Sequence, residues 1–135
     1  MGAWGTGVFQ DDDFVDWIYE LEQAEDAAFL METLEVVTKR GDEYLEAPEC
    51  SRALAAAETV AALKNVANPV LPDEVKKWVN VPSHQDGSDL VPLALKAIER
   101  IRTNSELQVL WDDSDHAAEW YNVLRDLEAR LRSTF

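Results

Sequence analysis

Apolar residues recur at intervals of three and four along most of the chain, which is the spacing of amphipathic helices. In the first such stretch, Phe14, Trp17, Ile18 and Leu21 form an apolar stripe, and the acidic segment Asp11–Asp13 precedes it. Acidic residues cap helix N-termini and interact favourably with the helix dipole there. No segment alternates apolar and polar residues between turn signals, as a β-hairpin does. The pattern therefore predicts an all-α protein.

Start and stop signals divide the rest of the chain into further helices. Pro48 fits the first turn of a long alanine-rich helix, and Ser105 with Gln108 matches a capping box. We expect the alanine-rich helix in the centre, because small side chains let neighbouring helices approach closely. Within the last helix, two acid–base pairs at i,i+4 are expected on the solvent side, Asp126–Arg130 and Glu128–Arg132. The expected helices cover about residues 26–40, 48–66, 72–79, 90–103, 105–111 and 115–132.

The length of the chain suits one domain. A single domain of 135 residues, spanning 1–135, can bury a sizeable core without disulfides or bound metals. We predict a compact, irregular bundle of five to seven helices, framed by the three long ones near 26–40, 48–66 and 115–132. Residues 1–10 are glycine-rich and are interpreted as an N-terminal plug that packs Trp4 and Phe9 against the helices. The longest loop is expected at residues 80–89.

Charge narrows the classes of partner. The chain has 27 acidic and 12 basic residues, a net charge of −15, which argues against binding to nucleic acids or to anionic membranes.

Its single cysteine, Cys50, excludes an internal disulfide and fits a reducing compartment. The N-terminus lacks the basic and apolar regions of a secretory signal, and no stretch reaches the length of a membrane span. We therefore expect a cytoplasmic protein.

The opening residues carry a resemblance to a known family. The chain begins Met1-Gly2-Ala3-Trp4-Gly5-Thr6-Gly7, and an aromatic residue and an acidic cluster follow. Further along, Glu106-Leu107 and Leu110-Trp111 precede more acidic residues and Trp120. The chain resembles a bacterial family of unknown function, whose short members open with the same Gly-Ala-Trp-Gly signature. The resemblance implies a compact, mainly helical protein and brings no catalytic residues.

The most distinctive charge pattern lies in the first two predicted helices. The first 38 residues contain ten carboxylates and no Lys, Arg or His. On the first helix, Asp13, Asp16 and Glu20 recur at three and four residues, opposite the apolar stripe, so they point to solvent together. We expect an acidic face there, which consists of Asp12, Asp13, Asp16, Glu20, Glu22, Glu25, Asp26, Glu32 and Glu35. The candidate partner-binding residues are Asp12, Asp13, Asp16 and Glu20.

A second cluster combines carboxylates with both histidines. His116 and Glu119 share one face of the last helix, beside Asp112 and Asp115, and His84 and Asp86 could join them from the long loop. Two imidazoles and a carboxylate would suit zinc. However, no recognised ligand motif is present, and such residues are ordinary caps and turn formers. We therefore assign no metal, catalytic or cofactor-binding residue, and we expect no cofactor.

Three hypotheses of function follow. The favoured one is a protein-binding module whose acidic face docks a basic partner, in the manner of a small acidic inhibitor or immunity protein. The first alternative is a metal-assisted or carboxylate-based hydrolase around the Asp/His cluster. The second alternative is that the acidic face has no specific partner and serves solubility only.

Overall fold

The computed structural model describes residues 14–41, 43–64, 72–82, 87 and 89–132. These residues contain helices and no strand, which confirms the predicted all-α bundle and the predicted range of helix number. The plug at residues 1–10 lies outside the described residues, as do residues 83–86 and 88 of the loop at 80–89. In the described part of the chain, seven helices follow one another: α1 (Phe14–Gln23), α2 (Ala28–Thr38), α3 (Ala47–Leu63), α4 (Asp73–Val79), α5 (Val91–Thr103), α6 (Glu106–Asp112) and α7 (Ala117–Arg132).

The alanine-rich helix α3 is the central element, as its composition predicts. Every residue from Ala53 to Leu63 is buried, and α3 packs against each of the other six helices that the structure describes. Alanine lets two helix axes approach closely, because interaxial distance depends on the side chains at the contact. The many alanine residues of α3 therefore allow other helices to pack on every side of it.

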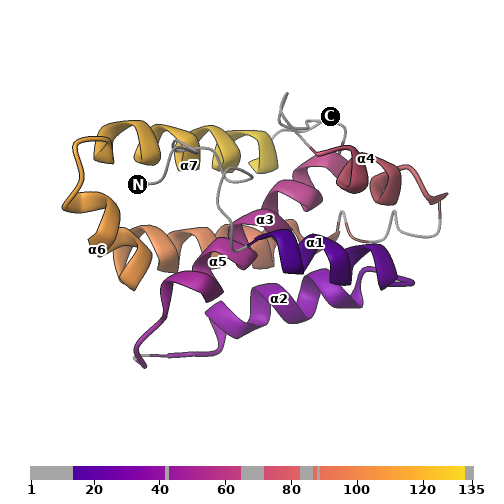
Figure 1. The fold of residues 1–135 in the computed structure, drawn as a ribbon, viewed down its shortest axis with the longest axis horizontal. Coiled ribbons are helices and arrows are strands. Elements are labelled where there is room, and N and C mark those ends of the chain that lie inside the picture. Colours follow the sequence, from indigo (N-terminus) through magenta and orange to yellow (C-terminus); the bar gives the residue numbers. More distant parts are fainter. Residues whose placement is uncertain (1–13, 42, 65–71, 83–86, 88, 133–135) are drawn as a thin grey trace.

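Two layers cover α3 and its neighbour α5. α7 lies along one side of this pair, and α2 lies along the other, with α1 beside α2 (Figure 1). α2 contributes Leu30, Leu34 and Val37 to the core, and all three are fully buried. These three residues, spaced by four and three, thus form the surface that packs on α3 and α5.

The helix starts differ from the expected ones by one or two residues, and for α2 and α3 the capping contacts give the reason. α2 begins at Ala28 because the Asp26 carboxylate accepts a hydrogen bond from the Ala28 N–H at 2.9 Å and so remains outside the helix. α3 begins at Ala47 because Glu46 forms a capping box with Glu49. At the predicted capping box of α6, the Ser105 hydroxyl accepts from the Gln108 N–H at 3.0 Å, as expected.

The expected solvent side of α7 is wrong in one respect. Glu128 is only 6% exposed, and Arg130 is half-buried rather than fully solvated. Both pairs expected from i,i+4 spacing are present, Arg130–Asp126 at 2.8 Å and Arg132–Glu128 at 3.9 Å. The helix packs against both α3 and α5, so residues flanking its apolar stripe are also covered.

Candidate functional site

The acidic face is the first candidate site, and its described carboxylates lie at the α1–α2 end of the chain. Asp16 and Glu20 on α1 are exposed, whereas Asp12 and Asp13 lie outside the described residues. The face continues into the turn and α2, where one carboxylate, Glu35, already has a cationic neighbour in Lys39 at 3.2 Å. The remaining described members are exposed: Glu22, Glu25, Asp26 and Glu32.

An aromatic pair joins α1 to α2 beneath this surface. The rings of Trp17 and Phe29 stack with centroids 5.4 Å apart. The Trp17 indole N–H donates to the Thr33 hydroxyl at 3.0 Å, and this hydroxyl donates to the Phe29 carbonyl at 2.9 Å. Trp17 itself is 1% exposed. The stack packs the Phe29 ring against α1, and the hydrogen bonds join Trp17 to α2 beside it.

The turn between α1 and α2 contacts α4. The Trp78 indole N–H donates to the Ala24 carbonyl at 3.1 Å, and Trp78 is 4% exposed. With the Asp26 bond to Ala28, this contact ties the turn to α4 and to the start of α2. The carboxylates on α1, the turn and α2 are therefore presented by an ordered scaffold.

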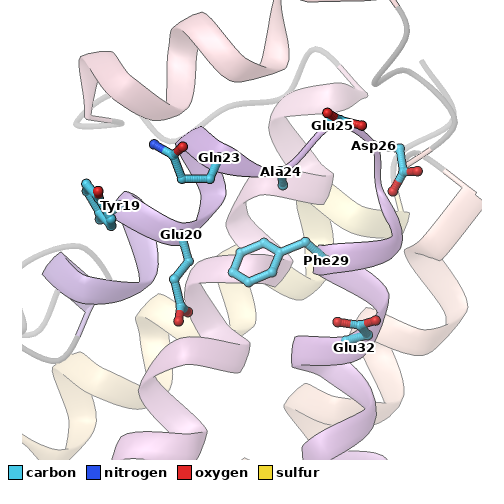
Figure 2. Close-up of a pocket in the computed structure, with 8 residues that line it drawn as sticks. All are labelled: Tyr19, Glu20, Gln23, Ala24, Glu25, Asp26, Phe29 and Glu32. Atoms are coloured by element: carbon cyan, nitrogen blue, oxygen red, sulfur yellow. The ribbon is translucent and has the colours of Figure 1, made fainter.

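A pocket lies between α1 and α2, with Phe29 among its walls (Figure 2). It is a shallow, widely open depression with a volume of about 410 Å³. The Phe29 ring extends from α2 toward α1 beside the Glu20 side chain (Figure 2). The pocket is lined by Tyr19, Glu20, Gln23, Ala24, Glu25, Asp26, Phe29 and Glu32.

The chemistry of this pocket favours a cation with a flat or apolar part. Four lining residues are carboxylates, none is Lys or Arg, and two, Tyr19 and Phe29, are aromatic. Carboxylates and the face of an aromatic ring both attract guanidinium and ammonium groups. The sequence pattern identifies Glu20 as a candidate but not Phe29, because Phe29 is not one of the regularly spaced apolar residues of α2.

The Asp/His cluster is the second candidate, and its members are already engaged with one another or exposed. His116 Nδ1 lies 3.1 Å from Glu119 Oε1, and both side chains are exposed. Asp112 accepts from the Tyr121 hydroxyl at 2.8 Å and from the Gln108 amide. Burial and then this Asp112 hydrogen bond raise the pKa of Tyr121.

The cluster does not converge on a metal position. Asp115 is exposed, while His84 and Asp86 lie outside the described residues. In the described parts of the chain, no three His, Cys, Asp or Glu side chains come together in a way that could hold a metal ion. The geometry of the described cluster thus lends no support to a metal-assisted reaction.

Cys50 occupies the core rather than a reactive position. The side chain is fully buried at the start of α3, as a small packing residue is expected to be. Burial raises the pKa of the Cys50 thiol to about 11, although hydrogen bonds from Ser105 and Leu107 oppose this shift. A thiol of this kind is protonated at neutral pH and is a poor nucleophile.

Comparison of the chain with known proteins gives one family match. A family model described as a domain of unknown function, DUF4259, matches residues 2–123. The match agrees with the resemblance to a family of unknown function that the sequence indicates. No curated protein and no solved structure matches the chain. None of the helices in the described residues combines the length and apolar character required to span a membrane.

Proposed function

The chain belongs to the DUF4259 family of domains of unknown function, and we propose that it is a protein-binding module whose acidic face docks a basic partner protein. The observation that carries this proposal is the exposure of Glu20, Glu25, Asp26 and Glu32 around one pocket without a cationic lining residue. An inhibitor-like or immunity-like role toward a basic enzyme or toxin is one form that such docking would take.

Electrostatic arguments support a binding role for the acidic face in addition to solubility. Carboxylates that share a surface without bases repel one another and cost stability, unless a complementary surface covers them. Their field would steer a basic protein to the face and accelerate association at low salt. The stacked Trp17–Phe29 pair supports the proposal, because a rigid surface loses less entropy on binding.

The test is a pull-down from host lysate at low and high salt. The wild-type bait is compared with a variant that carries Asp16→Lys, Glu20→Lys and Glu32→Lys. A matched control makes the same change in charge on the other side of the molecule, with Asp113→Lys, Asp115→Lys and Glu119→Lys, three exposed positions. Circular dichroism establishes that both variants keep the helical fold.

We expect a basic protein that the wild type and the control retain at low salt, and that the α1–α2 variant loses. High salt should weaken its retention, because screening shortens the range of the field. The proposal is wrong if the wild type retains no basic protein at low salt, or if all three baits retain the same one equally. In that case the acidic face serves solubility only.

A further inference from the structure

We infer that the α1–α2 pocket is the anchor point for one arginine side chain of the basic partner. This inference rests on the proposed docking of the acidic face and specifies which chemical group enters it. The pocket combines concave shape, an aromatic wall and carboxylates from separate segments, and a guanidinium group is complementary to all three.

The carboxylates approach the pocket from three directions. Glu20 comes from α1, Glu32 comes from α2, and Glu25 and Asp26 come from the turn between these helices (Figure 2). Asp26 already accepts the Ala28 N–H, so Glu20 and Glu32 are the stronger candidates for ion pairs. The lining therefore offers a cation carboxylates from both helices.

The aromatic wall discriminates between the two basic side chains. Phe29 is held by its stack on Trp17 and lines the pocket beside Glu20. A planar guanidinium stacks on an aromatic ring and donates several hydrogen bonds in a fixed fork, whereas an ammonium is a compact and strongly hydrated charge. The pocket should accordingly prefer Arg to Lys.

The pocket also has room for more than the charged group. Its volume of about 410 Å³ accommodates a long side chain and part of the backbone next to it. Tyr19 and Gln23 at its edge offer a hydroxyl and an amide that could bond to that backbone. An arginine within an exposed segment fits these features better than free arginine does.

The probe for this inference is a synthetic peptide, acetyl-Gly-Ser-Arg-Ser-Gly-amide, titrated into ¹⁵N-labelled full-length protein and followed by NMR. Two matched peptides replace Arg with Lys or with citrulline, which keeps the shape of arginine but has no charge. We expect the Arg peptide to shift the backbone amide signals of Ala24 and Phe29 and the indole signal of Trp17. The Lys peptide should bind more weakly, and the citrulline peptide should not bind.

Variants separate a specific pocket from a diffuse negative field. Glu20→Gln with Glu32→Gln alters the pocket, while Asp16→Asn with Glu22→Gln removes the same charge from exposed positions outside it. The first pair, and Phe29→Leu, should weaken the Arg peptide about fivefold or more. The second pair should have a smaller effect. Unchanged signals elsewhere in the spectrum show that each variant is folded.

The inference is overturned if no peptide shifts the pocket signals, if Lys and Arg peptides bind equally well, or if both pairs of variants weaken binding alike. These outcomes leave the proposed function intact when the lysate partner is still lost from the Lys variant. Failure of the lysate experiment itself would instead contradict the proposed docking. The two results therefore identify which statement is wrong.

Discussion

Arg130 of α7 forms a two-pronged ion pair with Glu58 of α3 across the core. Its Nη1 and Nη2 atoms donate to Oε1 and Oε2 of Glu58 at 2.7 and 2.9 Å, and the Glu58 side chain is fully buried. Burial alone would lower the pKa of Arg130, but the hydrogen bonds and charge of Glu58, joined by Asp126, raise it. The pair places a charge in the middle of the apolar helix α3.

Replacing Arg130 should destabilise the fold strongly. Arg130→Met leaves the Glu58 carboxylate buried without its two-pronged partner, and we expect the free energy of unfolding to fall by about 3–5 kcal/mol. Urea denaturation followed by circular dichroism measures this change. Arg132→Met is the matched control, because that side chain is 64% exposed and its loss should cost less than about 1 kcal/mol.

A double variant checks the cause. When Glu58→Met accompanies Arg130→Met, the buried charge itself is gone, and much of the lost stability should return. If Arg130→Met costs no more than Arg132→Met, or if the double variant is less stable than Arg130→Met, the buried charge is not the reason.

Gly87 should resist even the smallest side chain. It is buried, and a Cβ atom at this position would lie 2.5 Å from Leu63 Cδ1 and 3.3 Å from Ala27 Cβ. We expect Gly87→Ala to lower the free energy of unfolding by about 1–3 kcal/mol, the usual cost of overpacking. Thermal or urea denaturation gives the value.

The double variant Gly87→Ala with Leu63→Ala should show coupling, because removing the Leu63 side chain makes room for the new methyl group. Gly41→Ala serves as control: Gly41 has φ 62° and open space around it. Its cost of about 1 kcal/mol should come from the backbone alone and should add to that of Leu63→Ala. Simple additivity at Gly87 would show that no clash occurs there.

Glu106 should make stability sensitive to acid. The Ala47 N–H donates to Glu106 Oε1 at 2.7 Å, and this bond, followed by one from Tyr44, lowers the pKa of the carboxyl group. A pKa that is lower in the folded than in the unfolded state stabilises the fold above the unfolded value, near 4.5. That stabilisation is lost as pH falls through the folded value.

The measurement for Glu106 is urea denaturation at a series of pH values between neutrality and pH 3. The wild type should lose stability more steeply than Glu106→Gln below about pH 4.5, because the amide has no proton to gain. Equal slopes in the two proteins would contradict a role for this carboxylate.

Cys50 should react with thiol reagents only after the protein opens. With a pKa of about 11, its thiolate fraction at pH 7 is on the order of 10⁻⁴, and the side chain is inaccessible. Iodoacetamide labelling followed by mass spectrometry should therefore be slow in buffer and fast in urea. Rapid labelling of the native protein would place the thiol at an accessible site.

The sequence alone determined the secondary structure and most of the core. Helix formation is local, so the spacing of Leu30, Leu34 and Val37 already identifies the buried stripe of α2, and all three are fully buried. Alanine content likewise predicted the central position of α3. Caps were readable at Ser105 because their hydrogen bonds join residues close in sequence.

Only the tertiary structure decided which polar residues of different helices meet. Glu58 and Arg130 lie 72 residues apart, so no local pattern pairs them. The buried charge of Glu58 in α3 is stabilised because α7 places Arg130 beside it. The pocket has the same origin: Phe29 joins the carboxylates because α1 brings Trp17 against its ring. Periodicity reports which side of a helix is buried, whereas the contacts between helices depend on how they cross in space.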